Sequence, residues 1–353
     1  MPTVAEPEES RSGPIPALAG CSISDSCLFA WLPEIMVFNS SGPKPMCYSA
    51  QVRQSFSAYL REIGAVPDYE QITRILEQRL VDKSIRIPRG FERNFDHPMT
   101  VEDKRVRELI SQYRNATTTK FEQELFAQKK RLGDAERKLK VKQTKAALND
   151  QRIATNKIDT CVEKLALLRG TQSHEDDNRI FPMTYAPVVV KHEGRNLIRL
   201  ARYHLRQRGQ PASIDRQFPG LYNARRDNLE KFWRKEFGAT HALMIIDSFY
   251  ENVDRDGKNA VLHFNPWPAQ QMLVACLYGE WIHPREGPLL SFAAVTDEPP
   301  PEIAAAGHDR CIINLKPENV EAWLTPQGRS NGELQAILND RQQPSYEYQV
   351  EAA

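Results

Sequence analysis

The chain has 353 residues, of which 41% are hydrophobic and 26% charged, enough for one or two globular domains with a core. Its 47 Lys and Arg nearly balance its 46 Asp and Glu, so any nucleic-acid or membrane site must be local. The six cysteines form no C-x-x-C spacing, and no apolar run reaches the roughly 18 residues of a membrane-spanning helix. We therefore expect a cytoplasmic protein with reduced thiols and without a zinc site, a cofactor or a membrane segment.

The first 45 residues differ from the rest, because residues 1–45 mix Pro, Ser, Gly and Glu and show no sustained hydrophobic period. We interpret them as a disordered or artefactual leader. After residue 47, apolar side chains recur at helical spacing as far as Gly64: Val52, Phe56, Tyr59 and Leu60. The run "DYEQITRILEQRL" predicts a second helix over 68–80.

Residues 101–169 are rich in Lys, Arg, Glu and Gln and contain almost no Gly or Pro. A seven-residue repeat and its partner positions run through them: Leu125, Leu132, Leu139 and Ala146, with Phe121 and Ala135. This repeat predicts an amphipathic helix that can pair in a coiled coil, and Ile158, Val162 and Leu165 predict a second helix returning against it. The mixed charge is most simply a solvated face rather than a nucleic-acid site, and a partner helix could bind this inserted hairpin.

From about residue 180 the hydrophobic period shortens, and several runs are typical of strands between turns: "APVVVK", "HALMIIDSFYENV", "AVLHF", "MLVACLYGEW", "LLSFAAVT" and "CIINL". Pro317 opens a last helix, "PENVEAWL". Because strands and helices do not alternate in a βαβ rhythm, an α+β fold with a mainly antiparallel sheet is favoured. The composition shifts divide the chain into five segments: a leader (1–45), the first part of a domain (46–98), a helical insertion (99–170), the second part of that domain (171–328) and a tail (329–353).

The strand "MIIDSFYENV" is the first segment that could carry chemistry. Alternation along a strand puts four of its residues on one face: Ile245, Asp247, Phe249 and Glu251. That face is either the solvated side of an edge strand or a partly apolar setting. In the second case a carboxyl group with a raised pKa would suit proton transfer.

Two further segments carry basic residues and a histidine. The stretch 195–235, which includes "GLYNARRDNLEKFWRK", has eleven Lys or Arg against three acidic residues. It is either a phosphate-binding surface or a solvated helix face. In "AAAGHDRCIINL", His308 and Arg310 lie in a polar turn before an apolar strand. This turn is either structural or supplies a histidine that acts as acid or base near neutral pH, and no histidine spacing in the chain indicates a metal site.

A methionine, Met46, directly precedes Cys47 in "KPMCYSAQV". A lone cysteine is usually a small buried hydrophobe. If the working chain begins at Cys47, through translation from Met46 or removal of the leader, this residue carries both a free α-amine and a thiol. Such an amine condenses with an aldehyde to a Schiff base, and the thiol closes onto the imine carbon to give a thiazolidine. At neutral pH both groups are partly in their reactive forms.

Together these segments resemble the SRAP (SOS response-associated peptidase) family, whose members cross-link covalently to abasic sites in single-stranded DNA. "MCYSAQ" resembles the family's Met-Cys start, "YNARRDNL" its Asn-Ala-Arg segment, "DSFYEN" its acidic strand and "GHDRCIINLKPENVEAWL" its His-Asp-Arg segment. The resemblance covers about 46–98 and 175–326. It implies a lyase-like protein that protects abasic sites in single-stranded DNA during the DNA damage response.

The resemblance also implies roles for individual residues. Cys47 would form the cross-link, and Asn223 would position its amine and the opened sugar. Glu251 would move protons during Schiff-base formation, and His308 would act as acid or base in sugar-ring opening. Four further residues would contact DNA: Arg225, Arg226, Arg310 and Thr296.

The chain departs from the family pattern at two places. Many members begin Cys-Gly-Arg, and the third residue, a DNA-contacting arginine, is Ser49 here. Many members also carry tryptophans around a Tyr-Ala-Pro segment that wedge beside the lesion, where this chain has Met183, Thr184, Val188 and Val189. We expect the lesion chemistry to survive these changes more readily than the details of the DNA grip.

Two alternative functions remain open from the sequence. The first is an autoproteolytic cysteine peptidase, in which Cys47, His308 and Asn223 form a thiol–imidazole set. Only the cross-linking reaction needs the free α-amine of the cysteine as well as its thiol. The second is a non-enzymatic coiled-coil adaptor built around residues 101–169.

Overall fold

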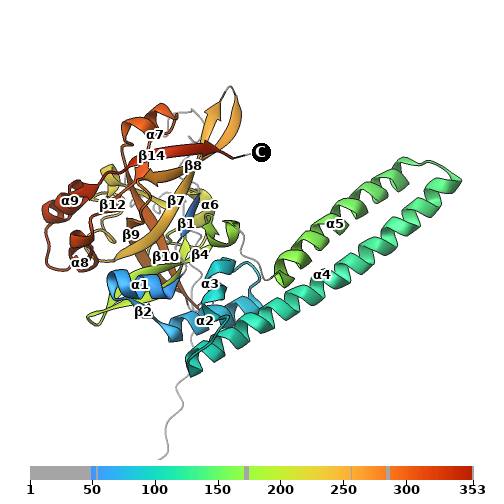
Figure 1. Cartoon of the computed structure of the whole chain (residues 1–353), viewed down its shortest axis with the longest axis horizontal. Coiled ribbons are helices and arrows are strands. Elements are labelled where there is room, and N and C mark those ends of the chain that lie inside the picture. Colours follow the sequence, from blue (N-terminus) through green and yellow to red (C-terminus); the bar gives the residue numbers. More distant parts are fainter. Residues whose placement is uncertain (1–48, 53–54, 171–174, 256, 284–286, 352–353) are drawn as a thin grey trace, which may run out of the picture. The chain divides into compact units, whose positions relative to one another are not determined.

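The computed structural model describes residues 49–52, 55–170, 175–255, 257–283 and 287–351, which belong to one compact unit (Figure 1). The predicted leader, Met46 and Cys47 lie outside the described residues. Helices, a large and mainly antiparallel sheet and a long helical hairpin are all present, so the predicted α+β class with a helical insertion is confirmed. Among the described residues, no helix is both long and apolar enough to cross a membrane.

The described residues form one sheet of fourteen strands, and most neighbouring strands run antiparallel. The strands are β1 (Ser49–Val52), β2 (Val66–Pro67), β3 (Arg179–Ile180), β4 (Tyr185–His192), β5 (Arg195–Tyr203), β6 (Asn223–Arg225), β7 (His241–Arg255), β8 (Lys258–Trp267), β9 (Met272–His283), β10 (Gly287–Asp297), β11 (Cys311–Ile312), β12 (Asn314–Leu315), β13 (Arg341–Gln342) and β14 (Ser345–Val350). Five of them close into a ring, because β7, β4, β5, β10 and β9 pair in this order and β9 pairs back to β7. Closure pairs both edges of each of these strands.

The α-helices are α1 (Phe56–Ile63), α2 (Tyr69–Val81), α3 (Arg89–Glu92), α4 (Val101–Val141), α5 (Lys145–Arg169), α6 (Ile214–Gln217), α7 (Pro301–Ala305), α8 (Val320–Leu324) and α9 (Asn331–Asn339). Short 3₁₀-helices cover Arg93–Phe95, Glu175–Asn178, Arg226–Asn228 and Pro317–Asn319. Helix α1 ends at Gly64 as predicted, where φ is 64°, a left-handed value that glycine adopts without strain. Val52 was predicted in this helix and is instead in β1, where it pairs with Ile246 and is fully buried.

Two hydrophobic clusters cover the two faces of the ring. The first contains side chains of all five ring strands and fills the ring, as with Val188, Ala201, Met244, Val274 and Phe292. The second lies on the outer face under helices α1, α8 and α9, with Tyr59, Trp323 and Leu334 among its members. The division follows from the alternation of side chains along each strand.

Strand β7 changes partners along its length. Its first half pairs with β4 and β9 in the ring, and its second half pairs with β1 and β8. Between the halves lies a bulge, since Gln51 of β1 pairs with Ser248 and the next residue pairs with Ile246, which skips Asp247. The predicted common face is therefore wrong, because the bulge puts Ile245 in the outer cluster and Phe249 in the inner one.

The start of β7 is held against α8 by a buried histidine. The ring of His241 stacks on Trp323 at 3.8 Å between ring centres, and its Nδ1 lies 2.8 Å from the Trp323 carbonyl oxygen. The backbone N–H of Gly238 donates to its Nε2. Since a carbonyl only accepts, Nδ1 carries the hydrogen and the ring is neutral. Burial lowers the pKa of His241 to about 3.

The insertion is an antiparallel pair of helices, α4 and α5. Helix α4 starts with a capping box between Thr100 and Asp103, and its first turns pack in a third cluster with α2. Farther along, α4 pairs with α5, and the buried side chains of this part are Gln128, Ala135, Ala147, Ala154, Cys161 and Leu165. Small residues dominate the seam, so the two helices approach closely.

The predicted seven-residue repeat is only partly correct. Leu125, Leu132 and Leu139 are half-buried beside the seam. Ala146 is not on the same helix, because α4 ends at Val141 and the Thr144 side chain caps the start of α5. Val162 was predicted to face the other helix and is 51% exposed.

Candidate functional site

A buried carboxyl group meets an imidazole at the end of the ring. Glu251 follows the bulge of β7 on the inner face, and His308 lies in the turn after α7; their side chains are 0% and 1% exposed. The Nε2 atom of His308 is 3.0 Å from Oε2 of Glu251, although the two atoms are not aligned as a hydrogen bond. Burial of both groups means that each has exchanged water for its protein neighbours.

The second nitrogen of His308 defines what this pair can do. Its Nδ1 lies 2.9 Å from the carbonyl oxygen of Arg310, which only accepts, so Nδ1 carries a hydrogen. Its Nε2 therefore faces Glu251. A carboxyl group and an imidazole this close are side chains of the kind that general acid–base catalysis uses.

Three of the predicted residues lie along neighbouring strands β6 and β10. Asn223 pairs with Ala294, and Arg225 pairs with Thr296. Because Ala224 belongs to the outer cluster, alternation turns Asn223 and Arg225 toward the inner face. Asn223 is 5% exposed and Thr296 is 0% exposed, so both are interior polar groups.

Strand β11 connects this row to the carboxyl–imidazole pair. Thr296 pairs with Ile312, and the neighbouring pair joins Asp297 to Cys311. Burial raises the pKa of the Cys311 thiol, and the nearby negative charge of Glu251 raises it further. The structure therefore brings Asn223, Thr296, Glu251 and His308 into one region.

Arg225 and Arg310 lie on the more exposed side of this region. Arg225 donates to both carboxylate oxygens of Asp227, at 3.0 and 2.6 Å. The hydrogen bond from Arg225 lowers the pKa of Asp227, and the positive charge of Arg310 lowers it further. Asp227 is thus paired with Arg225, and the Arg225 side chain is still 42% exposed.

Arg226, the fourth predicted DNA contact, is a structural residue in this arrangement. It pairs with Asp297 at 2.9 Å and donates to Gln335 and Asn339 of helix α9. Asp297 also pairs with Arg341 at 2.6 Å. A cavity of about 460 Å³ opens beside this network. The contact of Arg226 with DNA stays a prediction.

The first described residues lie against the same strand as Glu251. Ser49 pairs with Tyr250, the residue before Glu251. The guanidinium of Arg179 covers the Tyr250 ring at 3.5 Å, its Nε donates to Ser49 Oγ at 3.1 Å, and its Nη1 binds Glu351 at 2.9 Å. This cluster, which we call the β1 clamp, fixes the strand that follows Cys47.

Sequence reasoning missed the β1 clamp. Tyr250 is next to Glu251 in "DSFYEN", so its position was a usable signal, whereas nothing in the sequence marks Arg179 as its partner. The residues found in place of the family's tryptophans also have structural positions. Val188 and Val189 are fully buried on the two faces of β4.

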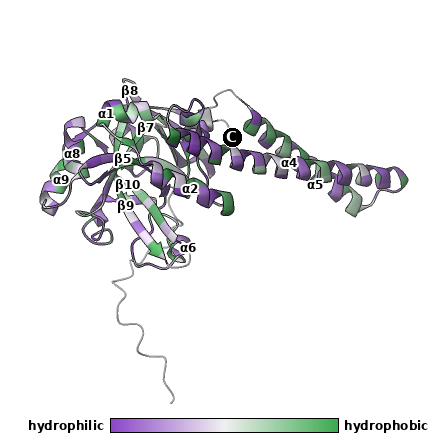
Figure 2. Ribbon diagram, turned by 90° about the horizontal axis from the view of Figure 1, so that it is seen from below, coloured by the Kyte–Doolittle hydropathy of each residue, from purple (hydrophilic) through white to green (hydrophobic). Residues whose placement is uncertain are grey.

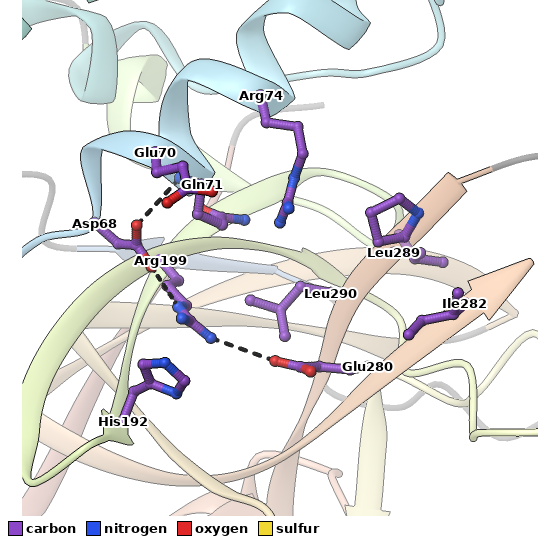
Figure 3. Close-up of a pocket in the computed structure, with 11 residues that line it drawn as sticks. Asp68, Glu70, Gln71, Arg74, His192, Arg199, Glu280, Ile282, Leu289 and Leu290 are labelled. Atoms are coloured by element: carbon purple, nitrogen blue, oxygen red, sulfur yellow. Dashed lines mark hydrogen bonds and ion pairs between the residues drawn. The ribbon is translucent and has the colours of Figure 1, made fainter.

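A separate cavity of about 370 Å³ lies between α2 and strands β5, β9 and β10. Figure 3 shows Arg199 at its centre, paired with Asp68 and Glu280, and Arg74 pointing in from α2. None of the predicted site residues lines it. Across the described ranges, no group of three or more His, Cys, Asp or Glu side chains is arranged to hold a metal ion.

A closed and mainly antiparallel ring with a buried carboxyl–imidazole pair at one end defines an α+β domain with an interior polar site. The family model described as SOS response associated peptidase (SRAP) matches residues 143–353, and the chain belongs to this family. The matched range includes Asn223, Glu251 and His308 and starts after Cys47. Family membership supports a function associated with DNA damage.

Solved structures resemble the chain at low sequence identity. A protein from Bordetella bronchiseptica is 16% identical with a TM-score of 0.42, and the match covers 50% of this chain and 88% of that protein's chain. A protein from Bacteroides thetaiotaomicron is 15% identical with a TM-score of 0.42, covering 53% and 87%. A phage-related protein from Bordetella bronchiseptica is 16% identical with a TM-score of 0.39, covering 54% and 89%. No curated protein is similar enough to count as a match.

Proposed function

We propose that this protein binds single-stranded DNA at abasic sites and captures them covalently through the α-amine and thiol of Cys47. The working chain would begin at Cys47, after translation from Met46 or removal of the leader. The product is a thiazolidine that shields the lesion. Family membership supports the damage-associated part of this function.

The observation that carries the proposal is the buried Glu251–His308 pair beside strand β1. Cys47 itself lies outside the described residues, two positions before Ser49. Two peptide units span at most about 7.6 Å between Cα atoms, and Ser49 pairs with the residue before Glu251. Covalent geometry therefore limits how far the cysteine can be from the acid–base pair.

The chemistry needs proton transfers and no oxidant. The α-amine adds to the aldehyde of the opened abasic sugar, and loss of one water gives the imine. The thiol then adds across the C=N bond, its sulfur to carbon and its proton to nitrogen. Glu251 would move protons in imine formation, and His308 would assist ring opening; the 3.0 Å separation of the two buried groups supports these roles.

The neighbouring residues support binding of the sugar and its phosphates. The buried amide of Asn223 and hydroxyl of Thr296 can accept and donate hydrogen bonds. Arg225 and Arg310 offer positive charge at the exposed side. A single strand is the expected partner, because an abasic sugar in a duplex must first leave the stack to be reached.

The direct test uses a chain beginning at Cys47 and an abasic single-stranded oligonucleotide, with adduct formation followed by denaturing electrophoresis and intact mass. We expect a stable adduct from this chain and none from Cys47→Ala. Cys47→Ser should give at most a reducible imine, because a hydroxyl closes the ring poorly. Glu251→Gln should slow the reaction by about 10²–10⁴, and Cys161→Ala, in the hairpin seam, serves as a thiol control.

Two results would contradict the proposal. A chain that retains residues 1–46 and still forms the adduct would show that the α-amine of Cys47 is not used. A Glu251→Gln chain that reacts at the original rate would remove Glu251 from the mechanism. Acetylation of the Cys47 amine in a chain that begins at Cys47 should block the adduct, and cleavage of a separate leader peptide by that acetylated chain would support the peptidase alternative.

A further inference from the structure

The charge of the helical hairpin is concentrated at its tip. Residues 129–152, which we call the hairpin tip, contain nine Lys or Arg and three Asp or Glu. The rest of the hairpin, 101–128 and 153–169, has eight against seven. The remainder of the chain outside the tip has 38 Lys or Arg and 43 Asp or Glu. The tip is thus strongly basic on a chain that is otherwise acidic.

The tip lysines are not used to hold the hairpin together. Arg131 pairs with Asp150 across the two helices, and Arg137 pairs with Asp134 along α4. Six exposed lysines have no ion pair among the described residues: Lys129, Lys130, Lys138, Lys140, Lys142 and Lys145. Their charges are available to a partner.

Helix geometry turns most of these charges away from the seam. At about 100° per residue, Lys129, Lys130 and Lys140 lie about 100–160° around α4 from the buried Gln128. Lys142 and Lys145 follow at the turn between the helices. Figure 2 shows hydrophilic and hydrophobic residues mixed along both helices. A line of lysines about 17 Å long is therefore presented to solvent.

We propose, building on the DNA-binding function above, that the hairpin tip is a second contact with DNA and binds the phosphate backbone flanking the lesion. Lysine ammonium groups bind phosphates as point charges without reading bases. About 39 Å of α4 separates Arg114, which pairs with Glu92 at the helix base, from Lys140. The tip therefore reaches phosphates beyond a short oligonucleotide, and its contribution depends on DNA length.

The test measures binding of the full chain to undamaged DNA, so that no covalent step is involved. Lys130→Gln, Lys140→Gln, Lys142→Gln and Lys145→Gln are combined, because glutamine keeps helix propensity while removing charge. The matched control combines Lys104→Gln, Lys120→Gln, Lys164→Gln and Lys258→Gln, which are exposed lysines outside the tip. Affinity is followed by fluorescence anisotropy between about 50 and 200 mM salt.

With a strand of about 40 nucleotides, or the same strand made duplex on one flank, the tip variant should bind at least about tenfold more weakly than the control. Its salt slope should fall by about 3, which corresponds to four lost phosphate contacts. With about ten nucleotides the two variants should bind alike. Equal salt slopes for the tip variant and the control variant on long DNA would overturn the inference. The tip lysines would then be a candidate surface for a protein partner. If the original chain forms no covalent adduct but the tip variant still binds long DNA more weakly than the control, the proposed cross-linking function is refuted and the inference about the tip stands.

Discussion

Protonation of His241 should set how steeply the stability of this fold falls in mild acid. The pKa of this histidine falls from 6.5 to about 3 in the folded chain, so between these values the unfolded chain binds one more proton than the folded chain. Stability therefore decreases as pH falls, by about 1.4 kcal/mol per unit. The loss is about 2 kcal/mol at pH 5 and about 5 kcal/mol once the pH is below 3.

His241→Gln isolates this effect, because the glutamine amide can donate to the Trp323 carbonyl and accept from the Gly238 N–H without titrating. Urea unfolding at pH 8, 7, 6 and 5 gives the difference in unfolding free energy between the two chains. We expect the advantage of the original chain to shrink by about 2 kcal/mol from pH 8 to pH 5. A difference that stays constant over this range would refute the reasoning, since all other groups titrate alike in both chains.

Two further predictions concern buried arginines. Arg179→Gln should slow adduct formation by loosening the β1 clamp, whereas Arg179→Lys should retain part of the rate because it keeps the charge near Glu351. Equal rates for both variants in single-turnover kinetics would argue against a positioning role for Arg179. Asp215→Asn should lower the unfolding free energy by about 3–5 kcal/mol, because Arg202 and Arg206 lose their shared carboxylate. Urea unfolding should show a far smaller loss for Asp227→Asn, which removes an exposed ion pair.

Sequence patterns predicted the elements better than their arrangement. The helical insertion and the end of α1 at Gly64 follow from local signals, namely composition, period and a residue that tolerates positive φ. The bulge at Asp247 could not be predicted, because a period-two pattern carries no mark of the residue that is skipped. That single residue decides which side chains share a face with Glu251.

The candidate site illustrates the same limit. Glu251 and His308 were chosen from separate motifs, and their contact at 3.0 Å depends on the path of the chain through β11 and α7. The parallel pairing of Arg225 with Thr296 is equally non-local. Arg179 was missed because an arginine that stacks on a tyrosine leaves no local pattern.

Because the two halves of β7 have different partners, they differ in the free energy that is needed to open them. Its first half is paired on both edges in the closed ring, so we expect its amide protons to exchange only when the whole domain opens. Its second half is covered on one side by β1, a strand of four residues. Detaching so short a strand breaks few hydrogen bonds and leaves the ring paired. Loss of β1 would therefore expose one edge of the second half of β7 beside Glu251 while the ring stays closed.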